Sequence, residues 1–446
     1  MPKNAVQAAF EKQIVVLPLN IIVPQRTITN SQRECDFYRQ ITASLKDVGL
    51  IEPLVVYPRA PGEYLLLEGH VRLRRVLARR PTAPPFPSTG PSITVIRPVK
   101  GVDTGAEDNI RTFLDMEYPG RLELLFVVDS EEDPATPLIR RLIAEHRTTA
   151  HRVELIFSGS PPPHRTGKLN AMLVGVAAAT GELLAFNDSD SRPAKELLGR
   201  LVSELLARPD CGCTFAPVVA AADRPTAGDV GYELLMNAWY GPTVSWAAEP
   251  RGELDFIMGQ LMVCRRQALD AVGGVGVAEG QFVDDMYIGR ALWKAGWKNV
   301  VIESPLRIFI GGMGPIQFFR TFRRWILFSE GGLSFRFTWP NWVRGVSCRV
   351  AWAVLAAALA TGNGAAAAMA LLAIAFSVYT QASLQRAYHG PRIRLHQLWV
   401  PAVIPLIGGL VQIAAKLNRR VDWRGRSYDL DAEARLGSSG SPAAGT

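Results

Sequence analysis

Three acidic motifs in this chain of 446 residues have spacings that suit nucleotide, metal or proton-transfer chemistry. The first, VVDSEEDPA, places Asp129 and Asp133 four residues apart, after an apolar run and directly before Pro134. A carboxylate at the end of a strand can accept hydrogen bonds from a nucleobase or a ribose. The alternative is an acidic helix N-terminus, where carboxylates interact favourably with the helix dipole. The residues alone leave both interpretations open.

The second motif, FNDSDSRP, places Asp188 and Asp190 two residues apart after an apolar run. Two carboxylates in an irregular loop can converge on one Mg²⁺ or Mn²⁺, which prefers oxygen ligands. Like charges held this close are unfavourable without a cation. The alternative is a solvated turn, and the position after a predicted strand favours the metal site.

The third motif, QFVDDMYIGRALWKAGW, begins a predicted helix with Asp284 and Asp285. Its apolar face would consist of Ile288, Leu292 and Trp293. Paired acids at a helix start usually cap it. One of them could instead be a general base whose pKa is tuned toward the working pH. The sequence does not separate the two roles.

A basic motif, IQFFRTFRRWILF, follows these acids in the chain. Arg320, Arg323 and Arg324 are spaced i, i+3 and i+4 and therefore share one face of a helix. A basic amphipathic helix of this kind can lie on an anionic membrane. Alternatively, one arginine neutralises a pyrophosphate leaving group.

An α/β sheet is expected to position these motifs. From residue 93 to about 330, short apolar runs alternate with helical patterns, which is typical of parallel strands joined by crossover helices. The predicted strands are 92–100, 122–130, 153–159 and 182–190, and helical patterns lie near 105–116, 134–147 and 168–180. Polar residues end each strand, at the sheet edge where ligands bind in open α/β folds.

Composition divides the rest of the chain into further regions. The predicted divisions are a small α/β unit at 1–80, a proline-rich linker at 81–92, the α/β region at 93–335, apolar helices at 345–416, and a basic, then disordered tail at 417–446. The segment Val350 to Gln385 carries no charge and is too long for one crossing of a core of roughly 30 Å. A turn at Gly362 to Gly364 predicts a hairpin whose first arm, 350–361, is short. A buried core helix is the alternative for 398–415.

Charge and cysteine content limit the remaining function classes. With 48% hydrophobic and 20% charged residues the chain is not disordered, and its net charge of +8 suits an anionic membrane or nucleic acid. The basic residues after the last apolar segment predict a cytosolic C-terminus and an even number of crossings. The five scattered cysteines predict reduced thiols rather than a disulfide or zinc site. No signal peptide is expected.

In this order, the four motifs resemble family 2 type glycosyltransferases of GT-A fold, in particular ceramide glucosyltransferases and hopanoid-biosynthesis-associated glycosyltransferases. The matching stretches are IRPVKGVD (96–103), DMEYPGRLELLFVVDSEEDPA (115–135), GKLNAML (167–173), DSDSRP (188–193), VDDMYIGRALWKAGW (283–297) and RRW (323–325). The resemblance implies that Asp133 and Asp129 bind the uridine of a UDP-sugar. It also implies that Asp188 and Asp190 reach the sugar nucleotide and its Mg²⁺ or Mn²⁺.

The same resemblance assigns roles to the remaining motif residues. Asp285 would be the general base that deprotonates the acceptor hydroxyl, and Arg324 and Trp325 would belong to the catalytic motif. Further substrate-binding residues would be Lys100, Lys168 and Asp284. The family motif is Gln or Arg, two residues, then Arg-Trp, and Thr321 occupies its first position here.

The N-terminal unit resembles the N-terminal domain of ParB/RepB-type partition proteins. The matching pieces are GLIEPLVV (49–56) and GHVRL (69–73). The resemblance implies that Gly69 and Arg72 contact a nucleotide phosphate. We do not expect DNA binding, because the proline-rich linker follows in place of a helix-turn-helix region.

These inferences predict an inner-membrane enzyme with a cytoplasmic catalytic domain. It would be an inverting glycosyltransferase that moves glucose or N-acetylglucosamine from a UDP-sugar to a lipid hydroxyl of ceramide, hopanoid or diacylglycerol type. The alternative is a nucleotide-binding partition or regulatory module that the remaining chain tethers to the membrane.

Overall fold

The computed structural model describes residues 22–24, 55–60, 63–68, 90–248, 251–333 and 335–437. The chain forms two compact units that divide between Pro84 and Pro85. In the first unit, strands β1 (Ile22–Pro24), β3 (Glu63–Glu68) and β2 (Val55–Ala60) form a three-stranded sheet in that order. Gly69 and Arg72 lie outside the described residues, so the partition-protein resemblance and its phosphate contact stay predictions.

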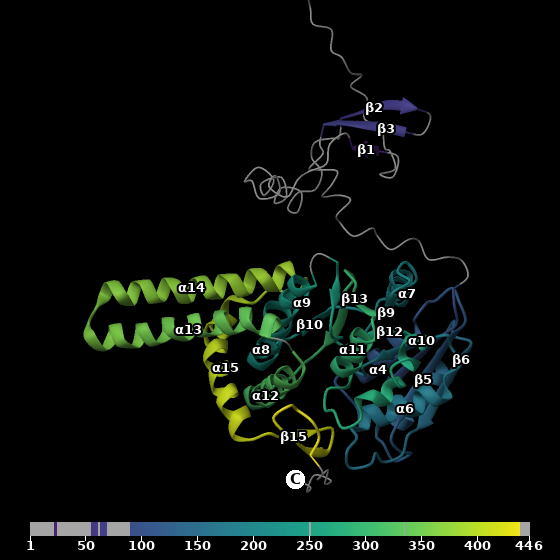
Figure 1. Cartoon of the computed structure of the whole chain (residues 1–446). Coiled ribbons are helices and arrows are strands. Elements are labelled where there is room, and N and C mark those ends of the chain that lie inside the picture. Colours follow the sequence, from purple (N-terminus) through teal and green to yellow (C-terminus); the bar gives the residue numbers. More distant parts are fainter. Residues whose placement is uncertain are drawn as a thin grey trace, which may run out of the picture. The chain divides into compact units, whose positions relative to one another are not determined.

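An eight-stranded mixed sheet is the centre of the second unit (Figure 1). Its order is β11 (Glu253–Leu254), β13 (Lys298–Val301), β9 (Cys211–Phe215), β12 (Leu261–Arg265), β7 (Leu183–Asn187), β4 (Ile93–Pro98), β5 (Leu122–Val128) and β6 (Arg152–Phe157). The four predicted strands are β4 to β7, and they run parallel. The α/β class is therefore confirmed. The sheet continues through antiparallel β12, which the sequence analysis did not identify.

Helices cover both faces of this sheet. The predicted helices are confirmed within a few residues as α4 (Ala106–Leu114), α5 (Ala135–Glu145) and α6 (Gly167–Ala178). Successive side chains of a strand point to opposite faces, so Val95 packs with α4, α5 and α7 (Leu197–Leu206), whereas Ile96 packs with α6. Both faces of β4 are therefore buried, as its continuous apolar run predicts.

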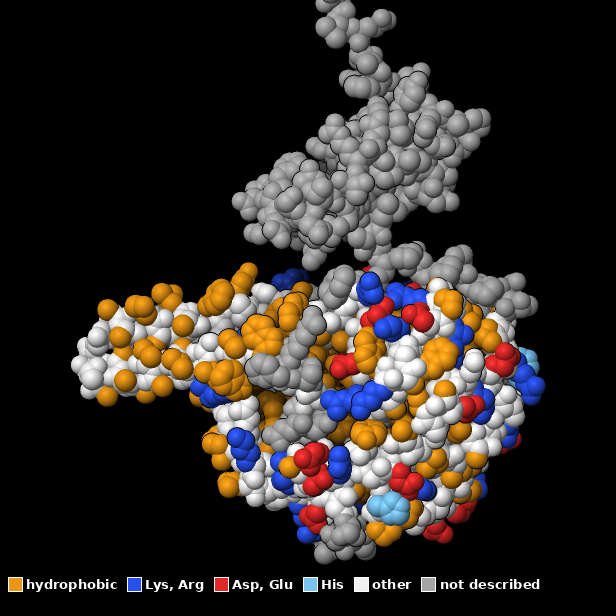
Figure 2. Space-filling model, viewed as in Figure 1, with side chains coloured by type: hydrophobic (Ala, Val, Ile, Leu, Met, Phe, Trp, Pro, Cys, Tyr) orange, Lys and Arg blue, Asp and Glu red, His pale blue; other side chains and the backbone are white. Residues whose placement is uncertain are grey.

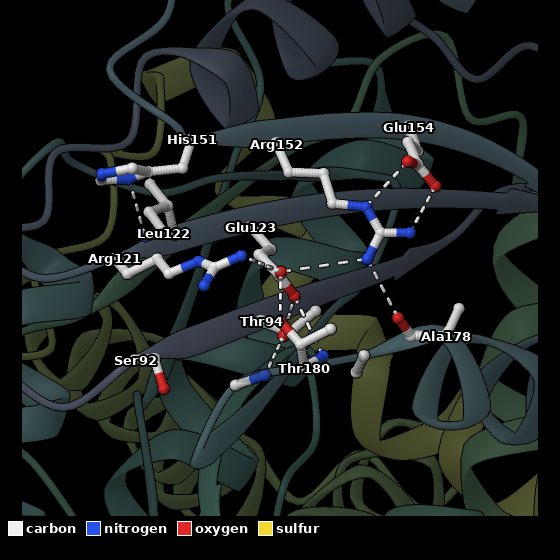
Figure 3. A network of polar contacts seen from close by, with 12 residues as sticks. Ser92, Thr94, Arg121, Leu122, Glu123, His151, Arg152, Glu154, Ala178 and Thr180 are labelled. Carbon is white, nitrogen blue, oxygen red and sulfur yellow. Dashed lines mark hydrogen bonds and ion pairs between the residues drawn. The ribbon is translucent and has the colours of Figure 1, made fainter.

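A buried carboxylate joins the amino ends of these strands (Figure 3). Glu123 of β5 accepts hydrogen bonds from the Thr94 hydroxyl at 2.7 Å and the Thr180 backbone N–H at 3.0 Å, and Arg121 and Arg152 lie within 4 Å. Burial alone would raise the pKa of Glu123, but the hydrogen bonds from Thr180 and Thr94 lower it. The network ties β4, β5 and the end of α6 together at the edge of the sheet opposite to the acidic motifs.

Four helices follow the sheet region: α12 (Pro315–Gly332), α13 (Phe335–Thr361), α14 (Gly364–Ala387) and α15 (Trp399–Leu417). Three stretches are long and apolar enough to cross a membrane: Phe337–Thr361, Gly364–Ala387 and Leu395–Leu417. The hairpin of α13 and α14 extends away from the sheet, and its surface is mostly apolar (Figures 1 and 2). The predicted turn at Gly362 is confirmed, with φ of 67° at this glycine.

Two predictions for this region are wrong. The first arm of the hairpin is not short, because α13 begins at Phe335, has 27 residues and is ~40 Å long. The basic segment is not followed at once by disorder, because β15 (Arg420–Trp423) and β16 (Arg426–Asp429) form an antiparallel hairpin. In the part of the chain that the structure describes, the cysteines are free and buried, as predicted, and Cys35 lies outside that part.

The C-terminal hairpin also bears on the membrane topology. It packs against Phe282 and Leu327, so the chain returns to the sheet-containing body after α15. Helix α12, which precedes α13 in the chain, packs against the same body. Both ends of the three apolar stretches are therefore joined to the same body, and the number of membrane crossings stays a prediction.

Candidate active site

The acidic motifs meet at the carboxyl edge of the parallel strands. In the sheet, β4 lies between β5 and β7, and the three strands run in the same direction. Lys100 follows β4, Asp129 follows β5 and Asp188 follows β7. The prediction that strand ends bring these residues together is confirmed. In an open α/β sheet this edge binds ligands.

Lys100 connects the two acids of the first motif. Its Nζ forms an ion pair with Asp129 and lies 3.2 Å from Asp133 Oδ2. Burial alone would lower the pKa of Lys100, but its hydrogen bonds to Asp129 and Asp133 raise it. The ammonium group is therefore charged at neutral pH and can interact with an anionic ligand.

The two acids of this motif have different environments. The Asp133 side chain is fully buried, and its Oδ1 accepts hydrogen bonds from the N–H groups of Ala135 and Gly101 at 2.9 and 3.0 Å. Burial opposes ionisation, but these hydrogen bonds and Lys100 lower the pKa of Asp133. Asp133 thus contacts the first N–H of α5, as the helix-start interpretation expects, and its role in binding uridine stays a prediction. Asp129 Oδ1, in contrast, is buried and has no hydrogen-bond partner within the described residues, so it lacks the donor that a buried carboxylate oxygen usually has.

The second motif forms a tight loop between β7 and β8 (Ser191–Arg192). The buried Arg97 holds the loop by donating to Asn187 Oδ1 at 2.9 Å and to the Ser189 carbonyl at 2.7 Å. Burial, with a smaller contribution from Asp188, raises the pKa of Asp190 to about 6. Asp190 Oδ1 is also buried and has no hydrogen-bond partner within the described residues. An unpaired carboxylate beside a second one is the environment that a cation stabilises.

The loop fits a cation that shares its ligands with a nucleotide. Among the residues that the structure describes, no group of three or more His, Cys, Asp or Glu side chains could hold a metal ion. Mg²⁺ commonly uses one or two carboxylates and completes its coordination with water and substrate phosphates. Asp188 and Asp190 match the two-carboxylate part of that donor set.

Lys168 connects this loop with the third motif. Its Nζ lies 2.9 Å from Asp188 Oδ1 and 3.6 Å from Asp284 Oδ1. Thr166 fixes the start of α6, because its hydroxyl accepts the Leu169 N–H at 3.1 Å. Burial alone would lower the pKa of Lys168, but the surrounding carboxylates raise it. Lys168 is therefore a permanent positive charge between the two acidic motifs.

The third motif begins α11 (Asp284–Lys294); Ile288 and Leu292 are buried as predicted, whereas Trp293 is only half-buried. Asp285 accepts the N–H of Gly259 at 2.5 Å and that of Met286 at 2.8 Å. Burial raises the pKa of Asp285 to about 6, with an opposing contribution from Lys168. A carboxylate with this pKa is basic enough to accept a proton and is still ionised at neutral pH.

Asp284 and Asp285 each accept the N–H of the residue that follows, and neither is the N-cap of α11. Asp284 Oδ1 accepts the Asp285 N–H at 2.9 Å. Its buried Oδ2 has no hydrogen-bond partner within the described residues. Both acids are therefore candidates for proton transfer, and the raised pKa favours Asp285.

The arginines of α12 occupy three different environments. Arg320 is exposed, Arg323 donates to the carbonyls of Asn418 and Arg420 at 2.7 and 2.6 Å, and Arg324 is half-buried. Burial lowers the pKa of Arg324, and the nearby Tyr232 and Asp190 partly oppose this shift. Trp325 packs on Tyr240 with ring centroids 5.4 Å apart. The interpretation of this segment as a helix lying on a membrane surface is wrong, because α12 packs into the core.

Several residues at this edge were not predicted. Arg97 and Asp103 lie within the stretch IRPVKGVD, which drew attention only to Lys100. Arg424 lies at the tip of the C-terminal hairpin and pairs with Asp103 across 321 positions of sequence. Tyr232 has a pKa raised by burial and by Asp190. Local patterns contain no signal for Arg424 or Tyr232, because their roles depend on contacts between distant segments.

Known proteins match most of this chain. The profile described as "Glycosyl transferase family 21" matches residues 64–436. "Ceramide glucosyltransferase 3" of Caenorhabditis elegans is 21% identical over 243 residues, which are 54% of this chain and 50% of that protein. "Ceramide glucosyltransferase" of Pyricularia oryzae is 29% identical over 157 residues, 32% of each chain. This chain thus spans half or less of the length of these curated relatives.

Solved structures resemble the chain as well. The structure titled "Mannosyltransferase PcManGT from Pyrobaculum calidifontis in complex with GDP-Man and Mn2+" has a TM-score of 0.47 at 21% identity, and the alignment covers 75% of this chain and 92% of that one. A glucosyl-3-phosphoglycerate synthase of Mycobacterium tuberculosis, solved with Mg²⁺ and UDP, has a TM-score of 0.33 at 17% identity, over 53% of this chain and 79% of that one. The family match extends from the first unit through the C-terminal hairpin, and the chain belongs to glycosyl transferase family 21.

Proposed function

We propose that this protein is a membrane-associated inverting glycosyltransferase of GT-A fold that transfers glucose or N-acetylglucosamine from a UDP-sugar to a lipid hydroxyl. The observation that carries the proposal is the convergence of Lys100, Asp129, Asp188 and Asp285 at one sheet edge. The family membership and the ceramide glucosyltransferases among its relatives support the same activity.

The donor would bind along the carboxyl edge of β4, β5 and β7. Asp129, whose Oδ1 lacks a donor within the described residues, suits the uridine, and the buried Asp133 would act mainly by fixing the Lys100 to Gly101 turn. The diphosphate would lie near Asp188 and Asp190. Mg²⁺ or Mn²⁺ held by these two carboxylates would supply positive charge beside the diphosphate when bound.

The proposed reaction is a single displacement in which Asp285 acts as the base. As the acceptor oxygen forms its bond to C1 of the sugar, its proton passes to the Asp285 carboxylate, and the bond from C1 to the phosphate oxygen breaks. Arg324 would stabilise the charge that develops on the departing UDP. Lys168 and Asp284 would hold Asp285 and the Asp188 loop in register, and Trp325 would fix α12 against the core through Tyr240.

A cavity next to α12 supports a lipid acceptor. It has a volume of about 350 Å³ and lies between α12, α13, α15 and the π-helical turn Leu235–Tyr240. Its walls are mostly apolar, as in Phe322, Ile326 and Ile404, with the polar side chains of Asn341 and Gln412 among them. Tyr240 lines the cavity and also contacts Trp325. The lining residues Phe322 and Ile326 flank Arg324 in the middle of α12, so a lipid chain bound here would lie against the helix that carries Arg324.

Membrane association is proposed to occur through the α13–α14 hairpin. Apolar side chains such as Leu359, Met369, Leu372 and Phe376 are each at least two-thirds exposed on it. A hydrocarbon environment removes this surface from water. We propose the inner membrane, with the sheet-containing body in the cytoplasm, since UDP-sugars are made there.

The test is transfer of radiolabelled sugar from UDP-glucose and UDP-N-acetylglucosamine to dispersed ceramide, hopanoid and diacylglycerol by the purified full chain. A labelled glycolipid that disappears in Asp285→Asn supports the proposal. Comparison of lipid extracts from cells with and without the gene would identify the natural acceptor. The alternative, a partition-type nucleotide module, predicts no glycolipid and binding of CTP by the N-terminal unit alone.

A further inference from the structure

The turn of the C-terminal hairpin has an unusual residue at its tip. Strands β15 and β16 are joined by Arg424 and Gly425, with φ of 51° and 76°. Positive φ at both central positions is typical of a type I′ turn, which favours Asn-Gly or Gly-Gly. A long arginine side chain in the left-handed region is uncommon, and such residues concentrate at functional sites. The conformation therefore calls for a functional reason.

The Arg424 guanidinium reaches the edge of the sheet that carries the acidic loop. It donates to Asp103 through two bonds, Nη1 to Oδ1 at 2.5 Å and Nη2 to Oδ2 at 3.0 Å. Nη1 also donates to the Lys100 carbonyl at 3.0 Å, and Nη2 lies 3.4 Å from Ser189 Oγ. Ser189 separates Asp188 from Asp190, so the guanidinium lies directly against the proposed metal-binding loop.

The base of the hairpin is fixed by packing. Val421 and Tyr428 are buried against Phe282, and Trp423 meets the same ring edge-on at 5.8 Å. On the other side, Arg323 of α12 donates to two carbonyls at the start of the hairpin. The segment is thus joined both to the helix that carries Arg324 and to the loop that leads into α11. The position of Arg424 is therefore set by the fold.

The charges around Arg424 fit an anionic ligand better than a purely structural ion pair. Asp103 lies outside the acidic motif, whereas Ser189, whose hydroxyl donates to Asp103, is part of that motif. The Arg424 side chain is 36% exposed. A structural pair would gain little from a partly solvated position. A planar guanidinium can bind phosphate oxygens through two bonds, as it now binds Asp103. Such a ligand would replace the Asp103 carboxylate as the partner of the guanidinium.

We propose that Arg424 is a binding residue for the diphosphate of the sugar nucleotide, exchanging its two bonds to Asp103 for bonds to phosphate oxygens. The donor site would then be completed by a residue that lies beyond the last apolar helix. The inference rests on the proposed function in one respect, which is that the donor carries a diphosphate.

The test is titration of the purified full chain with UDP, inorganic pyrophosphate and uridine, each in the presence of Mg²⁺, in wild type and Arg424→Gln. The matched control is Arg420→Gln, which removes one charge from the same hairpin at an exposed side chain. We expect Arg424→Gln to weaken UDP and pyrophosphate binding by about 10- to 100-fold, the range for charge-assisted hydrogen bonds. Uridine binding should not change, and Arg420→Gln should match wild type within about 2-fold.

Titration with Mn²⁺ alone provides a second measurement, in which Arg424→Gln should not weaken binding as it does for UDP. Without Arg424, the carboxylates of Asp103, Asp188 and Asp190 lose a positive neighbour, so the variant should bind Mn²⁺ as tightly as wild type or more tightly. A hairpin that had merely come loose would weaken uridine and Mn²⁺ binding together with UDP binding.

The outcomes separate this inference from the proposed function. Equal UDP and pyrophosphate affinities in wild type and Arg424→Gln overturn the inference, as does an equal loss for uridine. If wild type binds pyrophosphate through Arg424 but does not bind UDP, the inference holds and the UDP donor is refuted. If wild type binds neither ligand, both are refuted.

Discussion

Replacement of Asp285 by asparagine removes the proposed base and leaves the side-chain volume unchanged. Both oxygens of Asp285 accept backbone N–H groups, from Gly259 and Met286. An asparagine keeps only one acceptor oxygen, so its amide group must face one of these donors. The variant should therefore lose about 1 to 3 kcal/mol of stability, the range for an unsatisfied buried donor. Thermal melting has to be recorded alongside activity.

The effect on turnover should be much larger than this structural cost. Loss of a general base lowers kcat by about 10²- to 10⁴-fold. UDP affinity should change little, because Asp285 acts in the transition state and does not contact the proposed donor groups. A proportionate loss of UDP affinity would instead show that the variant had disturbed the Asp188 loop through Lys168.

The pKa of Asp285 also predicts a pH profile for the wild type. The carboxylate must be ionised to accept a proton, and its pKa is raised to about 6. The value of kcat should therefore fall about tenfold per pH unit as the pH drops below 6. Burial and the charges of Asp284 and Asp188 raise this pKa, whereas Lys168 lowers it. Lys168→Met should accordingly move the acidic limb of the profile to higher pH.

The assay is the initial rate of glycolipid formation at saturating donor and acceptor, from about pH 5 to pH 8, a range that brackets this pKa. Saturation matters because the pKa of Asp190 is also raised to about 6, and its protonation would act on donor binding. The assignment of the base is refuted if Asp284→Asn is inactive while Asp285→Asn retains activity. An unshifted acidic limb in Lys168→Met would refute the explanation of the pKa.

Three further predictions concern the metal, the N-terminal unit and the topology. Chelation by EDTA should abolish transfer, Mg²⁺ or Mn²⁺ should restore it, and Asp190→Ala should weaken UDP binding only when metal is present; full activity in EDTA would exclude the metal role. Deletion of residues 1–84 should leave transfer in detergent within a few-fold of the full chain, because the proposed catalytic and donor-binding residues all belong to the second unit, and a complete loss in a folded variant would contradict this. A cysteine at the exposed Ala432 should resist an impermeant reagent in intact spheroplasts, whereas labelling would place the C-terminus outside.

Local sequence patterns were sufficient for the α/β class and for the position of most acidic residues. The apolar runs of β4, β5 and β7 are short, continuous and followed by polar residues, which is what strands buried on both faces produce. Parallel neighbours bring their carboxyl ends to one edge, so the meeting of Lys100, Asp129 and Asp188 followed from the strand pattern. The antiparallel strand β12 was not predicted, because its short run resembles the other buried segments.

The extent of the first apolar helix could not be read from hydropathy alone. Charged and polar residues before Val350 made the first arm of the hairpin look too short to cross a membrane. In the structure the basic residues before Val350 belong to α13, and one of them, Arg344, donates to the Ala238 carbonyl at 3.0 Å. Helix length depends on such contacts with the body of the protein, which a local count of charges does not include.

Neighbouring residues along the chain were sufficient to indicate a glycosyltransferase similar to ceramide glucosyltransferases, and to place the strand ends and the acids that follow them. The pairing of the charges depends on the tertiary fold. The three arginines of α12 share a helical face in sequence, and yet Arg320 is exposed, Arg323 binds the C-terminal hairpin and Arg324 lies over the rings of Phe328 and Trp423. Arg424 looked like one charge of a basic tail and instead contacts Asp103, 321 positions away. The physical reason is that an ion pair depends on which segments the fold brings within a few ångströms, and periodicity and composition carry no information on that distance.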